Sequence, residues 1–307
     1  MGFGQRLTEA TRKSGTPLCV GLDPRWESLP MELRANRGGD TPDSLQAVAD
    51  AYEEFSLAVL DLVHGQTGVV KPQMAFYEAA GTPGLAALER VMRRARAMGY
   101  FTILDGKRGD IASTAEAYAQ AGLGGARHAQ ATFPVWQADS LTVNPYLGAD
   151  AVEPFISEAR KVSGGLFILV RTSNPGSGLF QNLECQGEPL WQRVARQVGA
   201  WGQTHVDSST LADVGAVVGA TQPAELAWMR RQLPAVPLLV PGYGAQGGAL
   251  DALKPAFGPK GIGAVVNSSR AILFPFKPEA TDWRDKIRQA ASHSARELAG
   301  ISGMAGA

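Results

Sequence analysis

The sequence predicts a protein of the α/β class, in which one domain over residues 1–307 forms a single (β/α)8 TIM barrel. Three observations lead to this prediction. Short apolar runs bounded by turn residues recur eight times, stretches with helical periodicity lie between them, and the length of 307 residues suits a closed barrel. A doubly wound open sheet is the structural alternative, and it is disfavoured because no Gly-x-Gly-x-x-Gly turn follows the first run.

The eight apolar runs have the length and composition of strands that are buried on both faces of a parallel sheet. They are Leu18–Asp23, Gly68–Met74, Phe101–Lys107, Ser140–Pro145, Gly165–Thr172, Gly215–Ala220, Pro237–Gly242 and Ile262–Ser268. Because helices alternate with these runs, we expect parallel pairing through right-handed crossovers, with the barrel core over residues 18–275.

Between the runs, apolar residues recur at helical spacing. The clearest stripe consists of residues three and four apart: Leu45, Val48, Tyr52, Phe55, Val59 and Leu62. Further helices are expected around residues 85–95, after Ser113, and over 150–161, 188–204, 222–232, 246–254 and 280–299. Of the two irregular segments, 24–42 and 173–189, the second is long enough to form a lid. We expect residues 301–307 to be a disordered tail.

Composition and charge limit the classes of function. The formal net charge is zero, so we expect neither nucleic acid nor a membrane surface as a partner. No apolar run is long enough to span a bilayer, and the first ten residues lack the core of a signal peptide. Cys19 and Cys185 fit no metal or redox spacing, and no pair of histidines has metal-ligand spacing. We therefore expect no metal and a reducing, cytoplasmic location.

Charged side chains occur near the carboxyl ends of the first three predicted strands, where the active site of such a barrel lies. Asp23 and Lys71 belong to the first and second strands, and Asp105 and Lys107 end the third. Residues two apart on a strand point to the same face, so we expect Asp105 and Lys107 to face inward beside Lys71 and Asp23. Such a network could protonate a carbanion and repel a substrate carboxylate, which is decarboxylation without a cofactor. The alternative is a structural salt-bridge cluster that closes the barrel mouth.

Residues near the last two strands indicate a phosphate site. Pro241–Gly248 is rich in glycine, contains Gly244 and Gln246, and leads into a predicted helix whose first backbone amides suit a dianion. Barrels commonly bind phosphate at this position, and Arg270 just beyond the last strand could add a paired contact. Ser173, after the fifth strand, could contact the edge of a flat heterocycle. An ordinary glycine-rich turn, a surface arginine and a turn serine are the alternatives.

These residues lie in motifs that resemble those of the orotidine 5′-phosphate decarboxylases, and in particular their longer bacterial branch (type 2). Asp105–Ile111 fits the Asp-x-Lys-x-x-Asp signature of that family, with Gly106 in place of the more usual alanine or larger residue. The other similar segments are Gly21–Arg25, Val143–Gly148, Arg171–Gly176 and Pro241–Gly248. Because a side chain at position 106 should point away from the site, we expect the glycine to affect packing only.

The resemblance implies conversion of orotidine 5′-phosphate to uridine 5′-phosphate (UMP) in de novo pyrimidine biosynthesis, without a metal or other cofactor. It implies that Lys107 protonates C6 of the pyrimidine, that Asp105 faces the departing carboxylate, and that Lys71 contacts the ribose and Asp105. It also implies a homodimer in which Asp110 and Thr114 contribute to the site of the neighbouring subunit.

The same resemblance implies the substrate contacts. Asp23 would contact the ribose, Ser173 the pyrimidine, and Gln246, Arg270 and Gly244 the phosphate.

Two other functions stay open. One is a metal-dependent sugar-phosphate decarboxylase or aldolase of the same barrel superfamily. In those enzymes a carboxylate stands where this chain has Lys71, which would repel a divalent cation. The other is a catalytically silent nucleotide-binding scaffold, for which a broken charge network would be expected.

Overall fold

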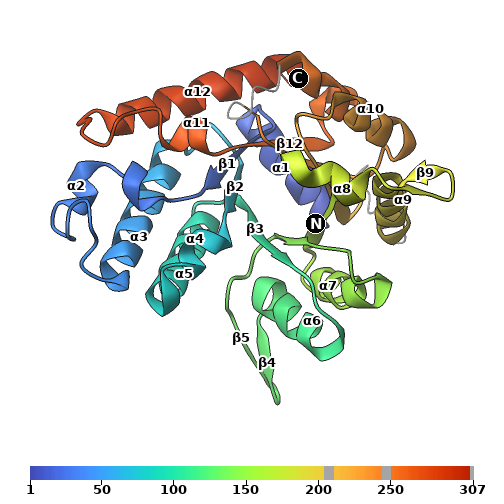
Figure 1. The fold of residues 1–307 in the computed structure, drawn as a ribbon, viewed down its shortest axis with the longest axis horizontal. Helices are drawn as coiled ribbons and strands as arrows, with labels where there is room; N and C mark the ends of the chain where they lie inside the picture. Colours follow the sequence, from blue (N-terminus) through green and yellow to red (C-terminus); the bar gives the residue numbers. More distant parts are fainter. Residues whose placement is uncertain (204–210, 244–249, 305–307) are drawn as a thin grey trace.

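Eight parallel strands close into a barrel, which confirms the predicted fold class (Figure 1). The computed structural model describes residues 1–203, 211–243 and 250–304. Neighbouring strands pair in the order β1, β2, β3, β6, β7, β10, β11, β12 and back to β1. Their bounds are Leu18–Leu22 (β1), Val69–Pro72 (β2), Phe101–Arg108 (β3), Ser140–Val143 (β6), Gly165–Arg171 (β7), Val214–Val218 (β10), Leu238–Pro241 (β11) and Ala264–Ser268 (β12). Each strand overlaps one of the eight apolar runs of the sequence.

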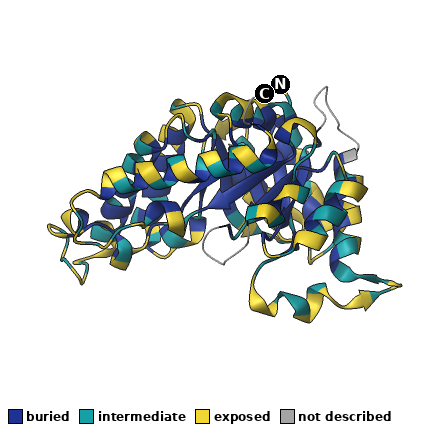
Figure 2. Ribbon diagram, turned by 90° about the horizontal axis from the view of Figure 1, so that it is seen from above, coloured by how far each residue is buried: buried dark blue, intermediate teal, exposed yellow. Residues whose placement is uncertain are grey.

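Helices surround the barrel, so that the buried strands lie inside a shell whose outer faces are exposed (Figure 2). The long helices are α3 (Leu45–Leu62), α5 (Gly81–Ala97), α6 (Ala112–Ala119), α7 (Ala149–Lys161), α9 (Leu190–Gln203), α10 (Pro223–Gln232) and α12 (Trp283–Ser302). The helix expected over 246–254 differs, because Leu250–Ala256 forms the 3-10 helix η4 and contains Pro255, which disfavours α geometry in the residue before it. Residues 246–249 lie outside the described part of the chain.

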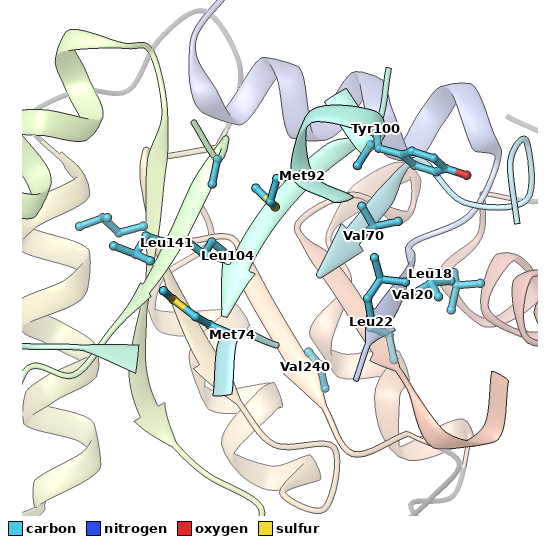
Figure 3. Packing of buried hydrophobic residues seen from close by; sticks show 14 of the residues in the cluster. Leu18, Val20, Leu22, Val70, Met74, Met92, Tyr100, Leu104, Leu141 and Val240 are labelled. Carbon is cyan, nitrogen blue, oxygen red and sulfur yellow. The ribbon is translucent and has the colours of Figure 1, made fainter. Parts of the chain in front are cut away.

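Apolar side chains pack in two layers, one inside the barrel and one between the strands and the helices. The inner layer contains Phe3, Leu7, Cys19, Val69, Phe101, Ile103, Phe167, Val217, Leu239 and Val265. Figure 3 shows part of the outer layer, where Leu18, Val20 and Leu22 of β1 lie near Val70 of β2. Cys19, between Leu18 and Val20, belongs instead to the inner layer. Successive side chains of β1 therefore point to opposite sides of the sheet, as strand geometry requires.

A helix that the sequence reading missed, α1 (Phe3–Ser14), precedes the barrel. The ring of Phe3 packs edge-on against Phe101 and Phe167, with centroid distances of 5.6 and 5.9 Å. Both partners belong to the inner layer near the amino ends of their strands, so α1 closes the end of the barrel opposite to the charged strand ends. The apolar face of α1 consists mainly of Phe3 and Leu7, which is too short a pattern for periodicity to reveal.

The irregular segment 24–42 is packed against the barrel's outer helices. It contains the 3-10 helix η1 (Trp26–Ser28) and the short helix α2 (Met31–Arg34). The side chain of Trp26 is buried, its backbone N–H donates to the hydroxyl of Tyr52 on α3 at 3.2 Å, and its indole N–H donates to the carbonyl of Asp40 at 3.1 Å. The segment therefore adds to the outer apolar layer.

The chain end differs from the expected disordered tail over 301–307. Helix α12 continues to Ser302, and Gly303 adopts a left-handed conformation with φ of 82° that ends it. The side chain of Met304 is only 6% exposed because it packs close to Gly261. The expectation was wrong for residues 301–304, and residues 305–307 lie outside the described part of the chain.

Two connections of the barrel contain small elements of their own, one after the carboxyl end of β7 and one leading into the amino end of β6. After β7 come the 3-10 helix η3 (Pro175–Ser177), α8 (Gly178–Gln181) and the strand pair β8 (Glu184–Cys185) and β9 (Glu188–Pro189). Between α6 and β6, the hairpin of β4 (Ala126–His128) and β5 (Ala131–Phe133) extends away from the barrel (Figure 1). Arg127 anchors this hairpin through a bidentate ion pair with the buried Glu158 of α7. No helix in the described ranges is both long and apolar enough to cross a membrane.

The buried contacts of Phe3 predict a stabilising role for α1. Phe3→Ala should lower the free energy of unfolding by about 3–5 kcal/mol, because it removes a buried ring and leaves a cavity. Phe180→Ala is the matched control, since that ring is 57% exposed, and it should change stability by less than about 0.5 kcal/mol. Urea denaturation monitored by circular dichroism measures both values. Equal effects of the two substitutions would contradict a closing role for α1.

Candidate active site

A bulge at the end of β3 determines how the charged side chains are presented. Leu104 pairs with Leu141 of β6 and Arg108 pairs with Val143, so the three residues 105–107 lie opposite Thr142 alone. Within the bulge the backbone of Lys107 has a φ of 45°, in the left-handed region that costs a non-glycine residue free energy. The sequence predicts that regular alternation along the strand places the side chains of Asp105 and Lys107 on the same face. The two side chains do meet, but the bulge, rather than alternation, brings them together.

The Asp105 carboxylate lies at the centre of a hydrogen-bonded network at the barrel mouth. Its Oδ2 atom accepts from Lys71 Nζ at 2.5 Å and from Gln73 Nε2 at 3.0 Å. Its Oδ1 atom accepts from Lys107 Nζ at 2.6 Å and from Thr142 Oγ1 at 2.9 Å. Asp105 and Lys71 are buried, whereas the Lys107 side chain is 45% exposed. One anion is therefore held between two cations, of which Lys107 is the more exposed.

The contacts of the network favour the charged forms of Asp105 and Lys71. Burial by itself raises the pKa of Asp105, but the ammonium groups of Lys71 and Lys107 outweigh it and hold that pKa well below its usual range. Burial by itself lowers the pKa of Lys71, but Asp105 and then Asp23 outweigh it and hold that pKa above its usual value. Asp105 is therefore a carboxylate and Lys71 an ammonium group at neutral pH.

The network lines a cavity of about 460 Å³, which is in the size range of sites for small molecules. Asp23 and Asn267 line this cavity and also a smaller hollow of about 140 Å³, which Arg270 lines as well. The two hollows are thus contiguous, with the ammonium groups in one and the guanidinium group in the other. The Oδ1 atom of Asp23 is buried and has no hydrogen-bond partner within the described ranges. A buried acceptor without a donor suits a ligand hydroxyl group.

A larger hollow, of about 1090 Å³, lies beside the candidate site between β7, α8 and α9. It shares only Leu169 and Thr172 with the cavity that contains the network, and it includes neither Asp105 nor either lysine. Because the buried carboxylate and the two ammonium groups bonded to it line the smaller cavity, we place the chemistry there.

Ser173 lines the same cavity as the charged network, at the end of β7. Its position depends on Gly219, which follows β10. A Cβ atom at residue 219 would lie 2.7 Å from the Cβ atom and 2.9 Å from the backbone nitrogen of Ser173. Only glycine, which has no Cβ atom, allows this close approach, so the placement of Ser173 depends on a glycine at position 219.

Arg270 is the first residue of the short helix α11 (Arg270–Leu273), and its side chain is exposed. Within the described ranges its guanidinium group has no hydrogen bond or ion pair, and its backbone carbonyl accepts from the N–H of Phe274 at 3.0 Å. It therefore remains available to an anion in the smaller hollow. Gly244 and Gln246, the other predicted phosphate contacts, lie outside the described part of the chain.

Asp110 and Thr114 do not join the network of their own chain. Neither residue lines the cavity. The carboxylate of Asp110 accepts a hydrogen bond from the backbone N–H of Ile111 at 2.8 Å, and Thr114 is exposed on α6. The neighbouring apolar side chains of Ile111 and Tyr118 are 55% and 39% exposed. Both predicted residues thus lie on an accessible face beside the site.

Three of the neighbours described above were missed in the sequence: Gln73, Thr142 and Gly219. Gln73 stands two residues after Lys71, a position that could have suggested a contact with the network. The importance of Thr142 and Gly219 follows from the approach of separate strands, which no local pattern shows. For Gly106, an added Cβ atom would meet no described atom closer than 3.5 Å, so the expected packing effect would be mild.

Beneath the network lies the inner apolar layer. Cys19 is fully buried, and burial raises the pKa of its thiol to about 12. It is therefore a neutral thiol at physiological pH, and its Sγ atom lies 3.7 Å from Asn267 Oδ1. The low polarity of this layer strengthens the electrostatic interactions of the charges above it.

Comparison with known proteins places the whole barrel in one family. A family model described as "Orotidine 5'-phosphate decarboxylase / HUMPS family" matches residues 16–281. The chain is 43% identical to an orotidine 5′-phosphate decarboxylase of Rhodopirellula baltica, over 98% of this chain and 100% of the relative. It is 41% identical to a protein of the same name from Deinococcus radiodurans, over 89% of each chain.

Solved structures agree with this assignment. The OMP decarboxylase of Leishmania donovani superposes with a TM-score of 0.74 at 32% identity, covering 98% of this chain and 99% of that one. The structure from Methanocaldococcus jannaschii in complex with the inhibitor BMP has a TM-score of 0.59 over 92% of this chain and 97% of that one, and its 18% identity supports the fold alone. From the matched residues, the full-length identities and the barrel, the chain belongs to the orotidine 5′-phosphate decarboxylase family.

Proposed function

We propose that this chain decarboxylates orotidine 5′-phosphate to UMP and CO2 in de novo pyrimidine biosynthesis. The observation that carries this proposal is the network of Lys71, Asp105 and Lys107, which lines a cavity contiguous with the hollow of Arg270. The names of the relatives support the same reaction. We further propose that the reaction needs no metal or other cofactor, because the ammonium groups supply fixed positive charge where charge develops.

The chemical step requires stabilisation of a carbanion. When the bond between C6 and the carboxylate breaks, its electron pair stays on C6 and CO2 leaves. The exposed ammonium of Lys107 then donates a proton to C6, and solvent later restores that proton. Asp105, ionised beside it, would repel the substrate carboxylate before it departs, and it accepts a hydrogen bond from Lys107 Nζ at 2.6 Å. Lys71 holds Asp105 in place and would also reach the ribose.

Binding at the remote end of the substrate supports the chemistry. Arg270, with Gln246 and Gly244, would hold the phosphate, Asp23 would accept a ribose hydroxyl group, and Ser173 would contact the pyrimidine. Enzymes use the binding energy of non-reacting groups to order the reacting ones. Among the described residues, neither the Asp23 Oδ1 atom nor the Arg270 side chain has a hydrogen-bond partner, which supports these assignments.

The metal-dependent sugar-phosphate enzyme that the sequence leaves open as an alternative needs a test of its own. Lys71 occupies the strand end at which those enzymes place a carboxylate, and its ammonium already binds Asp105 at 2.5 Å. A divalent cation there would meet a fixed positive charge. A catalytically silent scaffold is disfavoured because the charged residues of the network are all present.

We propose a homodimer in which Asp110 and Thr114 complete the neighbouring site. Both lie outside the cavity of their own chain, on the accessible surface of α6 and the two residues before it, which also exposes Ile111 and Tyr118. Exposed apolar side chains beside a site are typical of interfaces. We also propose that residues 1–307 act as a single barrel domain and that the protein works in the cytoplasm, where its free Cys19 and Cys185 would stay reduced.

The reaction and its proton donor can be tested together. In the presence of EDTA, the purified protein should convert orotidine 5′-phosphate at an undiminished rate, monitored by ultraviolet absorbance. Lys107→Ala should lower kcat by at least about 10⁴-fold while UMP binding persists, because it removes the proton and the fixed charge. Lys277→Ala, a change at an exposed site, should leave kcat unchanged. Loss of activity in EDTA would support the metal-dependent alternative, and near-normal turnover by Lys107→Ala would exclude this proton donor.

Because Gly219 leaves room for Ser173, we expect a larger residue at position 219 to weaken pyrimidine binding. Gly219→Ala should displace Ser173 and weaken UMP affinity about tenfold, the equivalent of one lost hydrogen bond. Gly106→Ala is the matched control, because its added methyl group has room, and it should leave UMP affinity unchanged. Isothermal titration calorimetry measures both. Equal UMP affinities of the two variants would contradict the role of Gly219 in placing Ser173.

The shared site predicts complementation between inactive variants. In a one-to-one mixture of Lys107→Ala and Asp110→Ala chains, half of the dimers are hybrids and each hybrid has one intact site. Activity should therefore recover to about a quarter of the wild-type value. Mass spectrometry of differently tagged chains would verify subunit exchange. If exchange occurs and activity does not return, Asp110 does not act across subunits.

A further inference from the structure

We propose that Thr142 is a positioning residue for decarboxylation, whose single hydroxyl group holds Lys107 and Asp105 in their reactive arrangement. The inference rests on the proposed function, since it concerns the same proton donor. It assigns a role to a neutral side chain on β6 that belongs to no charged motif.

Thr142 is the residue of β6 that faces the whole bulge of β3. Its neighbours Leu141 and Val143 pair with Leu104 and Arg108, so the strand register leaves residues 105–107 opposite Thr142. Its side chain is 1% exposed and lines the cavity of the network. A side chain at this position can therefore contact both ends of the bulge.

The hydroxyl group uses both of its hydrogen-bonding capacities there. It accepts from the backbone N–H of Lys107 at 2.9 Å and donates to Oδ1 of Asp105 at 2.9 Å. The same Oδ1 atom accepts from Lys107 Nζ at 2.6 Å. Backbone, carboxylate and ammonium group thus form a closed ring of contacts through one threonine oxygen.

The backbone contact is made where conformation is least favourable. Lys107 has a φ of 45°, which a residue with a side chain adopts only when surrounding contacts impose it. The regular β-ladder provides no such contact, because pairing is interrupted between Leu104 and Arg108. The acceptor on Thr142 replaces the missing ladder partner, so its loss would allow the Lys107 backbone, and with it the ammonium group, to shift.

A shift of this kind should lower the rate of the chemical step more than it lowers affinity. Misplacement of a reacting group by about 1 Å costs on the order of 10²-fold in rate. Ribose, phosphate and pyrimidine contacts come from other residues, so ground-state binding should be kept. This separates positioning from a direct contact of Thr142 with the substrate, which would affect both quantities.

A matched control exists at the opposite end of the same strand pair. The hydroxyl group of Thr102 on β3 donates to Oδ2 of Asp139 at 2.9 Å and accepts from the backbone N–H of Asp139 at 3.2 Å. It is 0% exposed and has the same bonding pattern, but it lies away from the cavity. Thr102→Val therefore reproduces the loss of a buried hydroxyl without touching the bulge.

The test compares Thr142→Val, Thr142→Ser and Thr102→Val in steady-state decarboxylation, with UMP inhibition constants measured in parallel. Thr142→Val should lower kcat on the order of 10²-fold, with the inhibition constant for UMP within about threefold of wild type. Thr142→Ser keeps the hydroxyl group and Thr102→Val keeps the site, so each should retain kcat within about threefold.

Several outcomes would overturn the inference. They are a normal kcat for Thr142→Val, an equal loss of kcat for Thr102→Val or Thr142→Ser, or a loss of UMP affinity that matches the loss of kcat. If Thr142→Val does not fold, Thr142→Ser decides, because a tenfold lower kcat in that variant contradicts the inference. A wild-type protein without decarboxylase activity would instead refute the proposed function, whatever the variants show.

Discussion

The buried Asp105 carboxylate is the constraint on which the site depends. Moving an ion out of water costs several kcal/mol even after relaxation, unless donors replace the lost solvation. Asp105 has four such donors. Two come from β2 and the residue that follows this strand, namely Lys71 and Gln73, one is Lys107 on β3 itself, and one is Thr142 on β6. The ends of these strands must therefore lie level with one another at the barrel mouth, so that all four donors reach the carboxylate. The parallel register of β1, β2 and β3, fixed by the apolar layers, supplies that condition.

This network is poorly explained as a device for stability. Replacing a buried ion pair by well-packed apolar residues is often neutral or stabilising, so folding alone gives little reason to keep two lysines and an aspartate here. The arrangement also leaves the Lys107 ammonium half-exposed toward the cavity and places its backbone at an unfavourable φ. An arrangement at the barrel mouth that costs free energy and gives the fold no stability in return is typical of a reactive site.

The sequence was sufficient to predict the strands and the charged residues, but not their local geometry. Parallel strands buried on both faces have a continuous apolar composition, so all eight could be located. Helix α1 was missed because only Phe3 and Leu7 mark its buried face, and the β4–β5 hairpin lies on an exposed extension without a core pattern. The bulge at residues 105–107 depends on the register of β6. The space at Gly219 likewise depends on the approach of β7, so neither can be predicted from local periodicity.

The bulge also explains why a glycine between Asp105 and Lys107 is compatible with this site. In a regular strand, residue 106 would point to the helix side and its side chain would pack there. Here the strand is bent, an added Cβ atom at residue 106 would meet Arg108 and Leu141 at ordinary contact distances, and Thr142 supplies the contacts that hold the bend. The bend is therefore maintained from the neighbouring strand rather than by the residue within it. The charges of β3 and the hydroxyl group of β6 form one structural unit, in which the position of the ammonium group depends on a neutral side chain across the sheet.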